Sequence, residues 1–321
     1  MTLELLKDKW INGINEVKVG ATKENGGTRS RVITLGGQAT LPFLFSEGRM
    51  PNKPVVAIEI LDVEPKEWPE TLKDALKGVS KDAVAWAAYC ADKCRADLLC
   101  VTLQGTHPDY GDIKPAESCK LIRRILKEVG LPLVIVGSGD KAKDNAVLSE
   151  ASQAAKGENC LFGFAAQDNY KTLAASCMAD GHSIVTDSPI DINIAKQVNI
   201  LVSDMGFDSK RIIMHPSTAS LGYGMEYVYS IMERARIAAF VGDKMLAMPF
   251  ILFVGQESWK VKEASATGAD THNWGDIKHR GPMWEIATAV SMLQAGADIL
   301  VLRHPKSVSV VKEYIDSMMN V

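Results

Sequence analysis

The sequence lacks an excess of charge of either sign. Its 321 residues include 36 lysines and arginines and 39 aspartates and glutamates, which gives a net charge of -3. Proteins that bind nucleic acid or anionic membranes usually carry a basic surface, so we expect neither partner here. No apolar run is long enough to span a bilayer, and the N-terminus mixes charged with apolar residues, unlike a signal peptide. We therefore expect a cytoplasmic protein.

Motifs of common catalytic and metal sites are also missing. The sequence has no CxxC, HExxH or GxSxG motif, and no lysine ends a predicted strand, where it could form a Schiff base. A zinc or iron–sulfur site at Cys90, Cys94 and Cys100 would have to straddle a helix and a buried strand. We interpret the six cysteines as reduced, buried thiols.

What the sequence does contain is a regular series of short apolar runs, each followed by a loop and a helical pattern. The runs are continuously apolar rather than alternating, which is typical of strands buried on both faces. About eight such runs predict a parallel (β/α)8 TIM barrel over residues 54–321. The runs are Val55–Leu61, Leu98–Leu103, Leu133–Val136, Cys160–Ala165, His182–Thr186, Arg211–Met214, Phe250–Val254 and Ile299–Leu302.

Residues 1–53 precede the barrel as a separate N-terminal extension. Apolar residues up to Trp10 and Ile14 recur at roughly helical spacing, which predicts a first helix. Arg31–Leu35 alternates in the manner of a strand and is ended by two glycines. We expect a helix and a small β element that plugs one end of the barrel or docks a partner.

Two helix starts are predicted from local signals. Ser80 is a candidate N-cap of the helix after the first barrel strand. Pro282 is expected at the start of a late helix, after a long polar excursion over residues 264–280. The length of this excursion indicates an ordered functional loop rather than a simple connector.

Polar side chains follow the predicted strands, at the end of the barrel where TIM barrels place their sites. The wider set of candidates is Asp62, Gln104, Ser138, Asp140, Gln167, Asn169, Asp187, Ser188, His215, Ser217, Gln256 and Arg303. The neutral and acidic members suit a ligand rich in amides, such as a corrin periphery or the edge of a pterin. Asp168 and Asp187 are equally well explained as caps of the helices that follow them.

Two further interpretations of the strand ends compete with these. Histidines His107, His215 and His304 follow different strands and would form a metal site if they converged, although local loop roles are more common. The glycine pair at Gly137 and Gly139 would present backbone N–H groups to an anion, although simple turn geometry explains such a pair better.

Long stretches of the chain resemble a known family. They are Gly20–Leu35 (GATKENGGTRSRVITL), Ser188–Asn193 (SPIDIN), Ser220–Ala235 (SLGYGMEYVYSIMERA), Gly242–Pro249 (GDKMLAMP), Trp259–Ala266 (WKVKEASA) and Arg303–Pro305 (RHP). These stretches resemble the small subunit of the corrinoid iron–sulfur protein of acetyl-CoA synthesis. The archaeal counterpart of that family is the delta subunit of the acetyl-CoA decarbonylase/synthase complex.

The resemblance implies a role in methyl transfer. In that family the small subunit is a (β/α) barrel paired with a large subunit, which holds the iron–sulfur cluster and the corrinoid-binding domain. The pair accepts a methyl group from methyltetrahydrofolate through a separate methyltransferase, and passes it on cobalt to acetyl-CoA synthase in the Wood–Ljungdahl pathway. The cobalamin-type corrinoid lies between the large subunit and the C-terminal mouth of the barrel.

This role requires no catalytic residue or metal ligand in the present chain, because a capping mouth acts by positioning and by excluding water. Strand-end position selects the groups that we expect to face the corrin: Gln104, Ser138, Gln167, Asn169, Ser188 and Ser217. The alternative is a stand-alone methyltetrahydrofolate:corrinoid methyltransferase, whose mouth would offer a carboxylate to the pterin. Asp62, Asp140 and Asp187 are the candidates for that carboxylate.

Overall fold

Eight parallel strands curve into a barrel in the computed structural model of the chain, which describes residues 6–320 apart from the side chains of residues 269, 270 and 272. The strand order is β8-β7-β6-β5-β4-β3-β10-β9, and a bridge between Met214 and Phe250 brings β8 next to β9. The predicted TIM barrel is confirmed. Its strands are β3 Val55–Leu61, β4 Leu98–Thr102, β5 Leu133–Val136, β6 Leu161–Ala165, β7 Ser183–Asp187, β8 Ile212–His215, β9 Ile251–Leu252 and β10 Ile299–Leu302.

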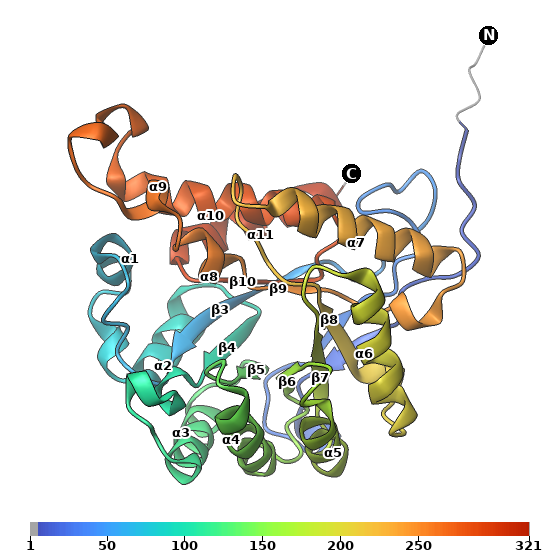
Figure 1. Cartoon of the computed structure of the whole chain (residues 1–321), viewed down its shortest axis with the longest axis horizontal. Coiled ribbons are helices and arrows are strands. Elements are labelled where there is room, and N and C mark those ends of the chain that lie inside the picture. The colour runs from blue at the N-terminus through green and yellow to red at the C-terminus, as the bar shows by residue number, and fades with distance from the viewer. Residues whose placement is uncertain (1–5, 321) are drawn as a thin grey trace.

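Helices surround the strands on the outside of the barrel (Figure 1). They are α1 Glu70–Ala75, α2 Ala83–Lys93, α3 Pro115–Glu128, α4 Lys141–Ala154, α5 Tyr170–Asp180, α6 Ile192–Asp204, α7 Met225–Phe240, α8 Val254–Ser258, α9 Lys262–Ser265, α10 Ile277–Gln294 and α11 Pro305–Met319. Over residues 6–320, none of them combines the length and the apolar character that a bilayer crossing requires.

Two helices begin at other residues than those predicted. Helix α2 is capped by Asp82, whose carboxylate accepts the N–H groups of Val84 and Ala85, and not by Ser80, which is buried. Helix α10 begins before Pro282, because Asp276 caps its N-terminus. The helix continues through Pro282, although proline donates no hydrogen bond there and its ring crowds the carbonyl of Lys278. The polar excursion is therefore short, and holds α9, one 3-10 turn and the first turns of α10.

The barrel interior and the outer layer form separate cores. Val55, Ala57, Ile213 and Ile299 belong to the inner core, which lies inside the ring of strands. The other side chains of the same strands pack under the surrounding helices. Because successive strand residues point to opposite faces, every second residue toward the end of a strand points into the barrel mouth.

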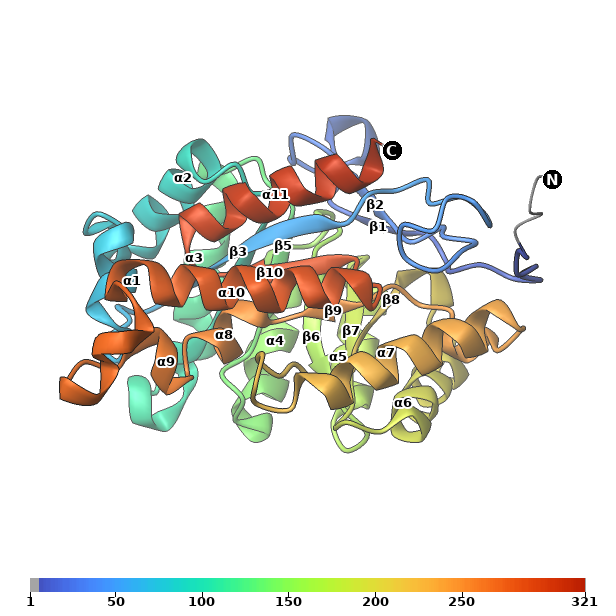
Figure 2. The ribbon, with the colours of Figure 1, turned by 90° about the horizontal axis from the view of Figure 1, so that it is seen from above.

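A small hairpin closes the opposite end of the barrel. Strands β1 (Val17–Val19) and β2 (Ile33–Leu35) pair antiparallel, and their apolar side chains join the inner core. Figure 2 shows this hairpin at the end away from α1 and α9. The predicted β element is thus present and plugs the barrel. The boundary at residue 53 stays a prediction.

The first helix that we expected is not formed over the described residues. The chain from Leu6 to Glu16 is not helical, and residues 1–5 lie outside the described range. The N–H groups of Ile11 and Ile14 donate to the carbonyls of Phe240 and Gln38 instead of to residues in their own segment. Trp10 packs against the ring of Phe240 at a centroid distance of 5.2 Å. Helix-like spacing here reflects tertiary packing of an irregular segment.

Candidate functional site at the barrel mouth

Inward-pointing residues at the C-terminal strand ends form the top layer of the barrel interior. Two groups occupy this layer. One contains a buried ion pair contributed mainly by β3 and β10. The other contains aromatic rings and a histidine–carboxylate pair contributed by β6, β7, β8 and the residue after β9. We call them the ion-paired half (Glu59, Thr102, Gln256, Arg303) and the aromatic half (Phe164, Asp187, His215, Thr218, Phe253) of the mouth.

Glu59 is the centre of the ion-paired half. Its carboxylate is fully buried and accepts hydrogen bonds from Thr102 Oγ1 at 2.7 Å, Gln256 Nε2 at 2.7 Å and Arg303 Nε at 2.5 Å. Burial alone would raise the pKa of Glu59, but the charge of Arg303 and these three hydrogen bonds lower it below its ordinary value. Arg303 also lies 4.5 Å over the ring of Trp68. Glu59 is thus an ionised, fully paired group rather than an available base.

His215 is the centre of the aromatic half. Its Nδ1 lies 2.7 Å from Asp187 Oδ1, and its Nε2 lies 3.0 Å from Thr218 Oγ1. Asp187 and His215 are direct neighbours in the β7–β8 register, so their side chains point to the same side of the sheet. The His215 ring contacts the rings of Phe164 and Phe253 at centroid distances of 5.0 and 5.2 Å. These three rings form an aromatic cluster in which Phe253 is buried and Phe164 and His215 are partly exposed.

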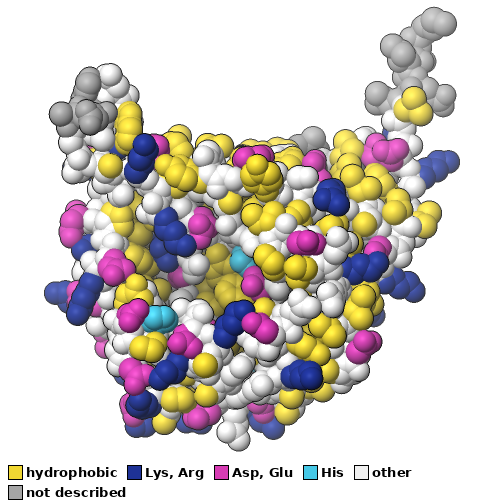
Figure 3. Space-filling model, viewed as in Figure 1, with side chains coloured by type: hydrophobic (Ala, Val, Ile, Leu, Met, Phe, Trp, Pro, Cys, Tyr) yellow, Lys and Arg dark blue, Asp and Glu magenta, His cyan; other side chains and the backbone are white. Residues whose placement is uncertain are grey.

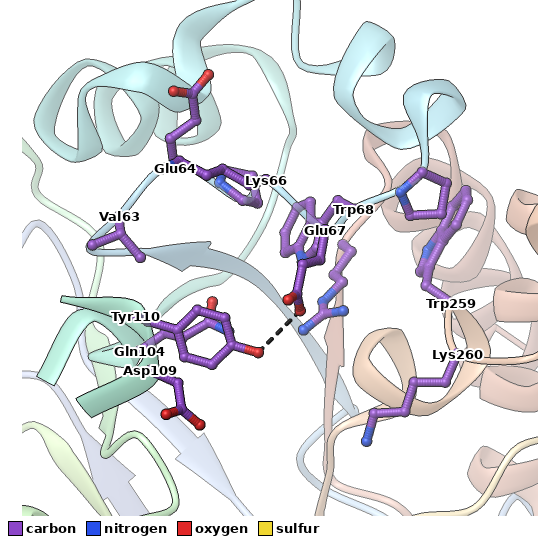
Figure 4. A pocket seen from close by; sticks show the side chains of 13 residues that line it. Val63, Glu64, Lys66, Glu67, Trp68, Gln104, Asp109, Tyr110, Trp259 and Lys260 are labelled. Atoms are coloured by element: carbon purple, nitrogen blue, oxygen red, sulfur yellow. Dashed lines mark hydrogen bonds between the residues drawn. The ribbon is translucent and has the colours of Figure 1, made fainter. Parts of the chain in front are cut away.

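A cavity of about 810 Å³ opens beside the ion-paired half (Figure 4). Its walls come from the loop after β3, the turns after β4 and the residues after α8. Trp68, Tyr110 and Trp259 supply aromatic surface, and Arg303 connects the cavity to Glu59. Tyr110 donates to Glu67 at 2.9 Å across the rim. Figure 3 shows the same face of the molecule hollowed, with hydrophobic side chains inside the hollow.

The structure brings some of the predicted corrin-facing residues to this mouth. Gln104 lines the cavity. Ser217 Oγ donates to the carbonyl of the buried Ser188 at 2.9 Å, so these two residues lie together beside Asp187 and His215. Gln167 is exposed.

The other two predicted residues are engaged in local structure. Ser138 donates to Asp144, whose carboxylate also accepts the backbone N–H groups of Ser138 and Gly139. That carboxylate therefore takes the place of the external anion considered for the glycine pair. Asn169 accepts the N–H of Ala166 at 2.7 Å and so orders the loop before α5.

The three strand-end histidines do not converge. His107 and His304 each accept a backbone N–H two residues further along their own loops, while His215 is held by Asp187 and Thr218. Within residues 6–320 no three His, Cys, Asp or Glu side chains lie close enough to bind a metal ion. The metal-site interpretation of these histidines is not supported.

The three carboxylates considered for a pterin are each used by the chain itself. Asp140 caps α4, and Asp187 holds His215. Asp62 accepts the N–H of Gly105 at 2.7 Å, and its second oxygen is buried without a hydrogen-bond partner. Burial raises the pKa of Asp62 to about 6. Asp168 forms an ion pair with Lys141 and does not cap a helix.

Glu59, Trp68, Phe164 and Phe253 are mouth residues that the sequence reasoning missed. For Glu59 a signal existed, because it is the one charged residue in the apolar run Val55–Leu61. A buried charge is costly unless it is paired, so a charge inside a strand marks a specific partner. The aromatic residues carried no such signal, since Phe in a strand is ordinary core composition.

The fold and the mouth define the class of the protein: a TIM-barrel protein whose polar and aromatic groups gather at the C-terminal end of the barrel. Solved dihydropteroate synthases share the fold. The chain matches the Coxiella burnetii structure with pteroic acid at a TM-score of 0.57 and 15% identity, covering 85% of this chain and 96% of that chain. A Yersinia pestis structure matches at a TM-score of 0.56 and 12% identity, covering 84% and 95%. At this identity the likeness shows the fold alone.

Sequence comparison is more specific. Residues 16–314 match the family model for the CO dehydrogenase/acetyl-CoA synthase delta subunit. The acetyl-CoA decarbonylase/synthase complex subunit delta of Methanosarcina mazei is 34% identical, over 97% of this chain and 72% of its own length. That of Archaeoglobus fulgidus is 34% identical over 98% and 70%. The chain belongs to the family of delta subunits of the acetyl-CoA decarbonylase/synthase complex.

Proposed function

We propose that the chain is the small subunit of a heterodimeric corrinoid iron–sulfur protein and that its barrel mouth covers the corrinoid. The family match over residues 16–314 carries the proposal, because subunits of this family work within a complex. In this proposal the large subunit holds the corrinoid and the iron–sulfur cluster. The pair passes a methyl group from a methyltetrahydrofolate:corrinoid methyltransferase to acetyl-CoA synthase.

The chemistry of the mouth fits a corrin. A corrin is a flat ring with apolar faces and an amide-rich edge. The partly exposed rings of Phe164 and His215, tilted by 33° to each other, offer aromatic surface that can contact the apolar ring faces. Gln104 and Ser217 stand at the rim with hydrogen-bonding groups for peripheral amides. Bound cobalt in its lowest oxidation state supplies a strong nucleophile for methyl transfer.

The mouth itself is suited to positioning rather than to acid–base chemistry. Glu59 is fully buried and paired, and the Asp187 oxygen that faces His215 is hydrogen bonded. A cover of this kind excludes water from the ring and supplies no mobile proton. Asp62 is the exception, because one of its carboxylate oxygens has no hydrogen-bond partner, so the alternative of a stand-alone methyltransferase with a carboxylate for the pterin depends on this residue.

The first test compares the lone chain with the chain co-produced with its large subunit, by size-exclusion chromatography and visible spectroscopy. We expect a colourless lone chain and a co-eluting pair with corrinoid and cluster absorption. In the pair, Gln104→Ala should lower corrinoid retention, whereas the matched Gln153→Ala change on the exposed face of α4 should not. A lone chain that binds methyltetrahydrofolate and methylates free cobalamin would overturn the proposal in favour of the transferase.

An apolar surface on α7 is our candidate for the large-subunit contact. Tyr227, Ile237 and Val241 are 62%, 45% and 61% exposed, and Ile11 of the N-terminal segment is 80% exposed next to the end of the same helix. Figure 3 shows hydrophobic side chains gathered over this helix. Obligate subunit interfaces are more apolar than the rest of a protein surface, which these exposed side chains fit. The double change Ile237→Glu and Val241→Glu should abolish co-elution, and Met178→Glu on α5 is the matched control.

A further inference from the structure

Both ring nitrogens of His215 are occupied by side chains of the same barrel mouth. Asp187 Oδ1 lies 2.7 Å from Nδ1, and Thr218 Oγ1 lies 3.0 Å from Nε2. The imidazole side chain is 13% exposed, so it is not fully buried. A mostly buried histidine that is hydrogen bonded at both ring nitrogens is held in one orientation, which simple core packing does not need.

The neighbouring groups define which nitrogen carries the proton. An ionised carboxylate only accepts hydrogen bonds, so Asp187 requires a proton on Nδ1. Thr218 Oγ1 accepts the backbone N–H of Phe253 at 2.9 Å, which uses one of its lone pairs. Its own hydroxyl proton is then directed at Nε2, where the neutral imidazole has its lone pair. That lone pair is the one with which a histidine would coordinate a metal.

The surrounding rings prevent the imidazole from turning away from these partners. Phe164 and Phe253 contact the ring of His215, and they contact each other at a centroid distance of 5.0 Å. Phe253 is 2% exposed and its own backbone N–H holds Thr218. The hydroxyl, the carboxylate and the two rings therefore restrain His215 from every side except the open mouth.

We propose that Asp187 and Thr218 are positioning residues that keep His215 from coordinating the cobalt of a corrinoid covered by the mouth. The proposal rests on the proposed function and deepens it. A metal that exchanges methyl groups needs a free axial position, and an imidazole at the mouth is the competing ligand. The hydrogen bond from Thr218 occupies the lone pair of Nε2, so the ring contributes a flat contact surface and no ligand.

The test uses the heterodimer loaded with corrinoid, with its cobalt in the paramagnetic Co(II) state. Thr218→Val keeps the side-chain shape and removes the hydroxyl. Electron paramagnetic resonance reports a nitrogen ligand directly, because the 14N nucleus splits the cobalt signal. We expect no nitrogen splitting in the unaltered pair and its appearance in Thr218→Val. Adding His215→Phe should remove the splitting again.

Matched variants separate this effect from general disturbance of the mouth. Thr102→Val removes a hydroxyl from the ion-paired half and should leave the spectrum without nitrogen splitting. If the Thr218→Val protein does not fold, Asp187→Ala tests the other ring nitrogen in the same way. A folded, corrinoid-loaded Thr218→Val pair without nitrogen splitting overturns the inference alone. An unaltered pair whose splitting depends on His215 also overturns it, and a pair that binds no corrinoid overturns the proposed function as well.

Discussion

Removal of the charge of Glu59 is the perturbation whose energetic consequence the structure defines best. Glu59→Gln keeps the length of the side chain and one carbonyl oxygen, but leaves the guanidinium of Arg303 without its counter-charge. The Arg303 side chain is 12% exposed and that of Glu59 is 0% exposed. Solvent therefore cannot replace the lost carboxylate without opening the barrel mouth.

The size of the effect follows from this burial. Breaking a buried ion pair by removing one partner typically costs about 3–5 kcal/mol, because the remaining charge is left uncompensated. Two further donors, Thr102 and Gln256, lose a charged acceptor for a neutral one, which weakens each bond. We expect Glu59→Gln to lower the free energy of unfolding by about 3–5 kcal/mol, within the range of buried-pair changes.

A double-mutant cycle measures the coupling. The variants Glu59→Gln, Arg303→Met and the double variant are unfolded in urea and followed by circular dichroism. Each single change should be strongly destabilising. The double variant should lose much less than the two single losses combined, because no charge is left unpaired. Additive losses, or a loss below about 1 kcal/mol for Glu59→Gln, would refute the buried pair as described.

Further predictions concern acid stability, thiol access and a close backbone contact. Burial raises the pKa of Asp62 from its ordinary 3.8 to about 6, so the folded state holds this proton more tightly than the unfolded state does. The free energy of unfolding should therefore fall by up to about 3 kcal/mol as the pH rises through this range. Asp62→Asn should remove that pH dependence in urea titrations at pH 4–7. Burial, with a contribution from Lys306, lowers the pKa of His304 to about 4, so the imidazole stays neutral in the folded protein while it is protonated in the unfolded chain. The free energy of unfolding should therefore fall as the pH drops from 6.5. His304→Phe should reduce this loss of stability in acid, and an unchanged loss would contradict the burial of His304. All six cysteines are free and buried, so a thiol reagent should react slowly in the native protein and with six thiols after unfolding, and rapid native labelling would contradict this burial. A Cβ at Gly137 would lie 2.2 Å from the Asp144 carboxyl carbon, so Gly137→Ala should cost about 1–3 kcal/mol by thermal melting, and an unchanged melting temperature would contradict this close contact.

The barrel was predictable from the sequence because its strands are buried on both faces. Continuous apolar runs such as Val55–Leu61 and Ile299–Leu302 coincide with β3 and β10 residue for residue. The N-terminal segment was not predictable in the same way. Trp10 and Ile14 are apolar because they pack on Phe240 and its neighbours, and the backbone hydrogen bonds that decide against a helix come from distant residues.

The candidate site was predictable in position but not in role. Strand-end reasoning found Arg303, Gln256, Asp187 and His215, all of which lie in the mouth. The same reasoning could not find the partner of Arg303 and Gln256, because Glu59 lies inside a strand rather than after it. The partners of a polar group depend on which strands are neighbours and on their register, which only the closed barrel fixes.

The pairing also explains why no catalytic set was recognisable from the sequence. A carboxylate that serves as a base must have an oxygen free to take a proton, whereas Glu59 has three donors on its two oxygens. Thr218 and Asp187 likewise satisfy His215 at both nitrogens. The charged groups of the mouth are thus used to hold side chains in place rather than to transfer protons. A surface built this way presents a fixed shape with few reactive atoms, which is what a cover for a reactive cofactor on another subunit requires.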